Sequence, residues 1–156
     1  MIKKVIKIIL VLICMITIFT FSNDSSYEST KKSNKLIITV AEIISNKQLN
    51  KNDKEKYIEK FVFIVRKGAH FSIYFLLGLL VASLLKEYNI LDKRMIIYSL
   101  IFCFIYACSD EMHQLFINGR SGEIRDVLID SIGAFIGISL YYLVRRRKNE
   151  QKKAIC

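Results

Sequence analysis

The chain has 156 residues, enough for one domain, and 53% of them are hydrophobic. These residues fall in long blocks, a pattern typical of membrane proteins, so a soluble domain is not expected. The formal net charge of +10 comes from lysines and arginines that flank the blocks, whereas a nucleic-acid-binding face would need a basic patch with interleaved aromatic side chains. We therefore expect membrane lipid as a partner, and no nucleic acid.

The first hydrophobic block lies at the N-terminus. Three lysines lie within the first seven residues, and residues 8–21 carry no charge. This pattern predicts a first transmembrane helix over residues 1–21. A cleaved signal peptide is the competing interpretation, because Thr20 and Ser22 are small enough to precede a cleavage site. We expect the helix to be retained as a signal anchor.

A polar segment, residues 22–60, follows and contains neither proline nor glycine. Apolar residues recur at helical spacing over residues 36–44 and again over residues 58–65, which predicts two amphipathic helices. Asn52 and Glu55 occupy the positions of a capping box before the second one. We expect this segment to be extracytoplasmic and to lie against the membrane surface.

The next part of the chain, residues 61–144, contains three further spans. The uncharged stretches 71–85 and 95–109 are each short for a bilayer, which needs about 20 helical residues. The second span must therefore include His70, and the third must continue to Ile117. Polar residues are thereby drawn toward the membrane at the ends of both spans.

The last span covers residues 127–144 and is interrupted only by Asp130. Gly133 and Gly137 lie one helical turn apart, a spacing that suits close helix packing within one chain or between two. A basic tail, residues 145–156, follows. Because the N-terminus, the turn between the second and third spans and this tail are basic, we expect both termini to be cytoplasmic.

These elements predict an all-α integral membrane protein, a four-helix bundle with an amphipathic helical insertion between the first and second spans. Antiparallel spans bring three polar groups to one extracytoplasmic face: His70, Asp110–Gln114, and Arg125 with Asp126 and Asp130. Charged groups in mid-bilayer cost about 2.5 to 3.5 kcal/mol each, so several in one layer should pair or line a wet cavity. We expect one site there.

Two motifs give the chain a family resemblance. The stretch Arg66-Lys67-Gly68-Ala69-His70-Phe71, with Tyr74 and Gly78 behind it, resembles the first signature of the VanZ-like bacterial membrane proteins. Asp110–Phe116, Gly119-Arg120, Asp126 and Gly133–Gly137 resemble the second, and the serines after Phe21 resemble the exit of the family's first span. Asn118 replaces a frequent proline before Gly-Arg. The resemblance implies a bacterial cytoplasmic membrane protein linked to resistance to the glycopeptide teicoplanin.

The candidate residues divide by their chemistry. Imidazole and carboxylate groups transfer protons or bind zinc, manganese or iron, and the candidates for both roles are His70, Asp110, Glu111 and His113. The candidates for holding a ligand are Arg66, Lys67, Tyr74, Gln114, Arg120, Arg125, Asp126 and Asp130. The spacing matches no established metal motif, so the sequence identifies no cofactor and leaves a divalent metal open.

Two functions from different classes stay open. In the first, a non-enzymatic envelope protein recognises an anionic lipid or a lipid-linked cell-wall precursor and alters access of the antibiotic. In the second, a membrane-embedded hydrolase or transferase acts on a lipid-linked phosphate, with His70 or Glu111 as base. A purely structural alternative is that Lys67, Arg120 and Arg125 neutralise the neighbouring carboxylates and lock three helix ends together.

Overall fold

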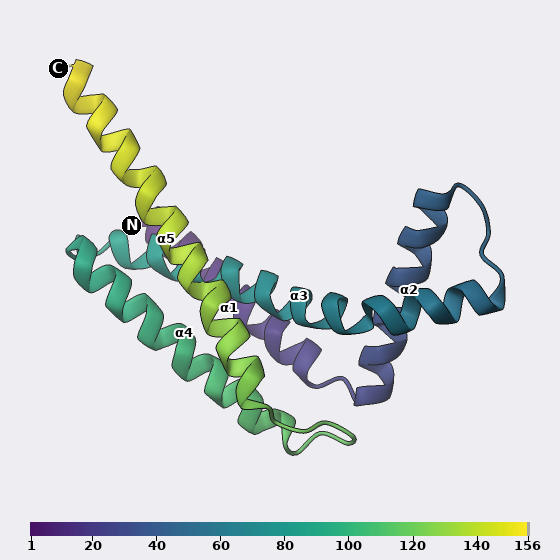
Figure 1. Ribbon diagram of the computed structural model, residues 1–156. Helices are drawn as coiled ribbons and strands as arrows, with labels where there is room; N and C mark the ends of the chain where they lie inside the picture. Colours follow the sequence, from purple (N-terminus) through teal and green to yellow (C-terminus); the bar gives the residue numbers. More distant parts are fainter. Residues whose placement is uncertain (156) are drawn as a thin grey trace.

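The computed structural model describes residues 1–155, and that part of the chain folds into five helices with no strand (Figure 1). The helices are α1 (Ile2–Ser22), α2 (Ser26–Ser45), α3 (Lys51–Lys86), α4 (Asp92–Gln114) and α5 (Ile124–Ile155). Four of them, α1, α3, α4 and α5, are long and apolar enough to cross a membrane. The all-α fold class and the four predicted spans are therefore confirmed.

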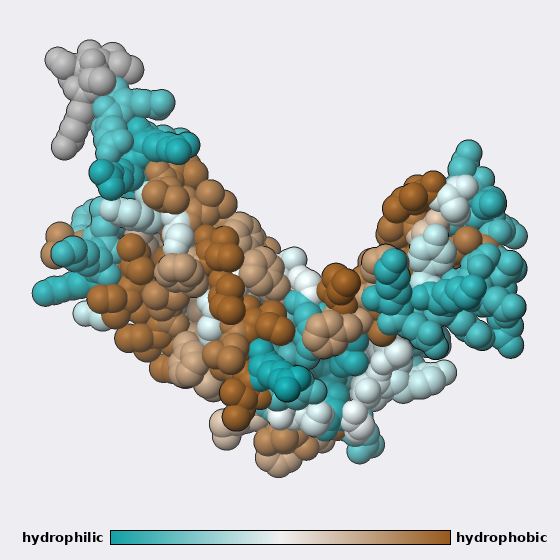
Figure 2. Space-filling model, viewed as in Figure 1, coloured by the Kyte–Doolittle hydropathy of each residue, from teal (hydrophilic) through white to brown (hydrophobic). Residues whose placement is uncertain are grey.

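The four spans pack around a small core in the body of the molecule. Its buried members come from every span: Val11, Cys14 and Ile18 of α1; Tyr74, Leu77 and Val81 of α3; Cys103 and Ala107 of α4; and Ala134 of α5. Around it, the face of the body that Figure 2 shows is largely apolar. Large side chains such as Ile97, Ile101 and Leu128 are more than half exposed, as a surface that faces lipid requires.

Helices α3 and α5 approach each other most closely, through glycines. A Cβ added at Gly133 would collide with the backbone oxygen of Phe71, and one at Gly137 with that of Phe75. Gly78 of α3 makes the reciprocal contact with the backbone of α5. The predicted close-packing face of Gly133 and Gly137 thus serves packing within the chain.

Helix α3 differs from its prediction at its start. Its N-cap is Asn50, whose side chain accepts a hydrogen bond of 2.9 Å from the Asp53 backbone N–H, so the capping box predicted at Asn52 and Glu55 is wrong. The second amphipathic helix is continuous with the second span, because no proline interrupts residues 51–86. A helix of 36 residues is about 54 Å long. It therefore extends well beyond a hydrocarbon layer of about 30 Å.

The first part of α3 and all of α2 form an arm that projects from the body (Figure 1). Polar side chains cover much of the arm in Figure 2. Helix α2 begins at its N-cap Ser25, which accepts from the Glu28 backbone N–H at 3.3 Å. The Ser26 backbone N–H donates to the Asn118 carbonyl oxygen at 3.3 Å. The base of the arm is thereby tied to the loop between α4 and α5.

The two last spans end elsewhere than the sequence predicts. Helix α4 ends at Gln114 and not at Ile117, and a loop with Gly119 at φ +73° leads into α5. Helix α5 continues past Val144 to Ile155, so the predicted basic tail is helical over its described part, while Cys156 lies outside the described residues.

Candidate functional site

Four acid or imidazole side chains meet at one end of the body. His70 comes from α3, Asp110 and Glu111 from the end of α4, and Asp130 from α5; each offers one donor atom, and all these atoms lie within 4.8 Å of one another. We call these four residues the carboxylate cluster. The three carboxylates are buried, with exposed fractions of 5% for Asp110, 5% for Glu111 and 0% for Asp130. Oxygen and imidazole donors in this number can hold a divalent metal ion.

Hydrogen bonds hold one oxygen of each α4 carboxylate. The Glu123 backbone N–H donates to Oε2 of Glu111 at 2.9 Å. Nε2 of Gln114 donates to Oδ2 of Asp110 at 3.3 Å and to Oγ of the buried Ser22 at 3.0 Å. The end of α1 and the start of α5 therefore fix the direction in which Asp110 and Glu111 point.

Other carboxylate oxygens of the carboxylate cluster have no hydrogen-bond partner. Both oxygens of Asp130 and Oε1 of Glu111 are buried without one. Nδ1 of His70 lies 3.6 Å from Oδ1 of Asp130, which is longer than a hydrogen bond but forms an ion pair when the imidazole is protonated. Burying a carboxylate in this way is costly unless another group neutralises it.

An ion pair lies directly beside the carboxylate cluster. Nζ of Lys67 bonds to Oδ1 of Asp126 and lies 3.5 Å from Oε2 of Glu123. Lys67 and Asp126 are both largely buried, at 19% and 11% exposed. This lysine is thus committed to carboxylates outside the carboxylate cluster.

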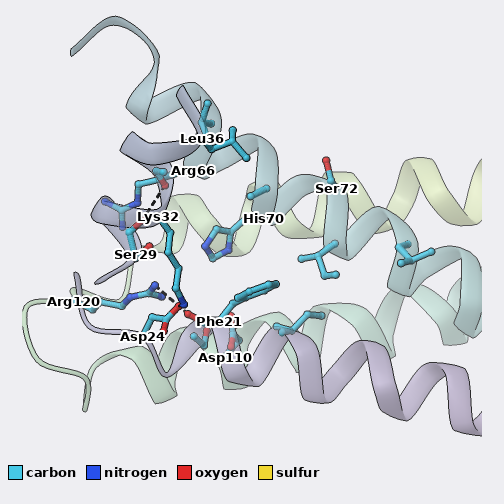
Figure 3. Close-up of a pocket in the computed structure, with 17 residues that line it drawn as sticks. Phe21, Asp24, Ser29, Lys32, Leu36, Arg66, His70, Ser72, Asp110 and Arg120 are labelled. Carbon is cyan, nitrogen blue, oxygen red and sulfur yellow. Dashed lines mark hydrogen bonds and ion pairs between the residues drawn. The ribbon is translucent and has the colours of Figure 1, made fainter. Parts of the chain in front are cut away.

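A pocket of about 530 Å³ opens beside His70 and Asp110, between the end of α1, α2 and α3 (Figure 3). Part of its wall is apolar, from Ile18, Ile73 and Leu76. Lys32, Arg66 and Arg120 line it as well. The pocket therefore combines a hydrocarbon-like surface with three cations.

The three cations of the pocket are neutralised unequally. Lys32 pairs with Asp24 at 2.6 Å, whereas Arg66 and Arg120 form no ion pair with any carboxylate of the described residues. Nη2 of Arg120 donates to the Phe21 carbonyl oxygen at 3.3 Å. Burial, and then repulsion from Arg66, lowers the pKa of Arg120. An anion placed between the two guanidinium groups would relieve that repulsion.

The structure separates some candidates that the sequence grouped together. His113 lies outside the carboxylate cluster, stacked on the ring of Phe19 with 4.7 Å between centroids, and Asp130 occupies the fourth position. Arg125 is exposed and makes no ion pair within the described part of the chain. Tyr74 is fully buried in the core, 6.3 Å from the ring of Tyr106.

Sequence reasoning missed the contribution of the arm. Asp24 and Lys32 line the pocket, as do Ser29 and Ser33 of α2. The signal in the sequence was the four-residue spacing of the two serines, which places them on one helix face. That spacing gave no indication of which helix the serines would face.

The chain is similar to known proteins along most of its length. The family model described as VanZ/LLP1 matches residues 7–145. A membrane protein of Bacillus subtilis (strain 168), described as "Uncharacterized membrane protein YwnJ", is 49% identical over 47 residues, and the match covers 30% of this chain and 33% of YwnJ. The chain thus matches about a third of the length of that relative. No solved structure matches.

Proposed function

Since the chain belongs to the VanZ/LLP1 family, we propose that it acts in the bacterial cell envelope by binding an anionic lipid or a lipid-linked cell-wall precursor. The two unpaired guanidinium groups at the apolar pocket, Arg66 and Arg120, carry this proposal. A guanidinium group forms bidentate hydrogen bonds with a phosphate. The apolar wall formed by Ile18, Ile73 and Leu76 suits the first carbons of a lipid chain.

The arm supports a location at the membrane surface. On α2, Ile37 and Ala41 are buried, while Leu36, Ile43 and Ile44 are 54%, 72% and 80% exposed. Exposed apolar side chains on an otherwise polar helix suit an orientation along the lipid interface. In the proposed orientation the basic termini are cytoplasmic, so the pocket and the arm lie at the extracytoplasmic face of the cytoplasmic membrane.

Binding to purified protein in detergent tests the recognition step. The probes are farnesyl phosphate for a lipid-linked phosphate, phosphatidylglycerol for an anionic membrane lipid, and phosphatidylcholine as the neutral control. Arg120→Gln should weaken binding of whichever anionic probe binds by about tenfold or more, the usual effect of a charge-assisted hydrogen bond. Arg125→Gln is the matched control, because Arg125 is exposed and unpaired; it should change affinity less than about twofold.

The same variants test the link to teicoplanin. A sensitive Gram-positive host expressing the wild type should survive a higher teicoplanin concentration, and Arg120→Gln should lose this protection while Arg125→Gln keeps it. Membrane abundance is measured in the same cells. If the wild type binds lipid but gives no protection, the resistance role is rejected and the recognition role stands. Equal binding by Arg120→Gln and the wild type would reject recognition by this pocket.

A membrane-embedded hydrolase or transferase acting on a lipid-linked phosphate is the second candidate. Oε1 of Glu111 has no hydrogen-bond partner and lies in the carboxylate cluster with His70, which favours this function. A general base needs a free lone pair within reach of the proton that it removes from the substrate. Glu111→Gln keeps the shape and hydrogen-bonding capacity of the side chain. If recognition alone suffices, Glu111→Gln retains partial protection; if turnover is required, protection disappears at unchanged abundance.

A further inference from the structure

We propose that His70, Asp110, Glu111 and Asp130 bind one divalent transition-metal ion at the inner end of the pocket. Three helices supply the four donors, and their donor atoms lie within 4.8 Å of one another. Two ligands at about 2.2 Å from one ion are separated by at most about 4.4 Å. Small side-chain adjustments therefore bring the carboxylate cluster to metal-binding distances without moving a helix.

The unpartnered oxygens indicate that a cation completes this group. Asp130 is 0% exposed, and neither of its oxygens has a hydrogen-bond partner. Lys67, the nearest lysine along α3, is already bonded to Asp126. The ion pair with His70, at 3.6 Å, offsets the cost of burying Asp130 only when the imidazole is protonated. A buried carboxylate left without a charged partner costs several kcal/mol. A bound dication offsets that cost for all three carboxylates together.

The hydrogen bonds around the carboxylate cluster leave free the oxygens that a metal would need. The Glu123 backbone holds Oε2 of Glu111 at 2.9 Å, and Oε1 has no partner. Gln114 holds Oδ2 of Asp110 at 3.3 Å. Partners that fix one side of a ligand and leave the other side free are typical of the outer shell of a metal site.

The donor types select a class of metal. One imidazole with three carboxylates suits Mn²⁺, Fe²⁺ or Zn²⁺, whereas Mg²⁺ and Ca²⁺ take oxygen ligands and Cu⁺ prefers sulfur. His70 and Asp110 also line the pocket, which gives an ion a route to the carboxylate cluster. The proposed ion is independent of lipid recognition, because Arg66 and Arg120 are not among its ligands.

Metal binding is tested on the full chain in detergent without added lipid. The protein is stripped with EDTA, exchanged into buffer, and titrated with Mn²⁺ or Zn²⁺ alone, with bound metal measured by plasma mass spectrometry and Mn²⁺ also by electron paramagnetic resonance. We expect one ion per chain. Asp130→Asn should weaken binding by about tenfold or more. Asp92→Asn, the same change at the opposite end of the body, where Asp92 pairs with Lys86, should change it less than about threefold.

Thermal unfolding gives a second readout. Cys14 and Cys103 are buried, so a thiol-reactive fluorophore reports their exposure as the helices separate. Metal should raise the midpoint of unfolding for the wild type and for Asp92→Asn, and not for Asp130→Asn. If Asp130→Asn is not monodisperse, His70→Gln takes its place.

Three results would overturn the metal site. They are no bound metal in the titrated wild type, no change in its unfolding midpoint, or equal affinities for Asp130→Asn and Asp92→Asn. Lipid binding, measured separately, could still hold after each of these results.

Discussion

The two ends of the membrane-spanning body carry charge in different ways. At the end where α1 begins, Lys7 pairs with Glu87 and Lys86 with Asp92, each at 2.5 Å. Their side chains are 14% to 49% exposed. We call these two pairs the basic end. Every carboxylate there has its own lysine and contact with solvent.

The opposite end holds carboxylates that are buried and outnumber the cations paired with them. We call the carboxylate cluster with Lys67 and Asp126 the polar end. Lys67 forms an ion pair with Asp126, while Asp130 has no hydrogen-bond partner. Ion pairs connect helix ends in both places, but only the polar end also has buried carboxylate oxygens without a hydrogen-bond partner. That excess, and not the presence of charge, is the reason we propose that a ligand or ion binds there.

The largest expected effect concerns the close contact between α3 and α5, two helices that run between both ends of the body. Gly137→Ala places a Cβ against the backbone oxygen of Phe75, and backbone cannot yield as a side chain does. We expect a loss of about 3 kcal/mol of stability, at the upper end for overpacking, seen as a lower thermal midpoint and a smaller monodisperse fraction.

Gly68→Ala is the matched control for Gly137→Ala. Gly68 also lies inside a helix, but an added Cβ there has nothing within 4 Å. It should therefore be neutral or stabilise the helix by up to about 1 kcal/mol. Equal losses at both glycines would mean that the α3–α5 contact does not depend on glycine.

A smaller effect distinguishes the ion pair of the polar end from its unpaired carboxylates. Lys67→Met leaves Asp126 buried and unpaired, and we expect it to cost about 2 kcal/mol, since both side chains retain slight exposure. The double variant Lys67→Met/Asp126→Leu should recover most of that loss in thermal unfolding. If the double variant stays as unstable as the single one, the lysine acts on the carboxylate cluster as well.

The sequence predicted where the polar end lies, but not which side chains of α4 join the carboxylate cluster. Apolar block lengths and antiparallel order sufficed to bring His70, Asp110 and Asp130 to one end. They could not separate Glu111 from His113, because residues so close along one helix cover most of its circumference. Only packing sets the rotation of α4 about its axis, and it turns His113 toward Phe19 of α1.

Other details depend on contacts that no local pattern contains. Lys32 reaches the pocket because α2 folds back along α3, and the bond from Ser26 to the Asn118 carbonyl helps to fix that return. That bond joins the first residue of α2 to a turn far away in the sequence. The cap of α3 was misplaced for a different reason: Asn50 and Asn52 are both good N-caps, and the sequence alone did not distinguish them.

The smallest effect is expected at the basic end. A hydrogen bond that Nζ of Lys7 donates to Glu87 holds the pKa of Glu87 below its ordinary value. A lowered pKa in the folded state means that this stabilisation is present above the unfolded pKa of about 4.3 and is lost as the pH falls through the lower, folded value. Thermal midpoints of the wild type and Glu87→Gln should therefore differ slightly at pH 7 and converge in acid.

The size of this difference decides whether the two ends are distinct. Glu87 and Lys7 are partly solvated, so water replaces the lost partner, and the change at pH 7 should be well below that of Lys67→Met. Glu150→Gln, which breaks the exposed pair with Arg146, is the control for loss of one surface charge. A Glu87→Gln loss as large as that of Lys67→Met would show that burial does not separate the ends, and the excess carboxylates would be the one remaining difference.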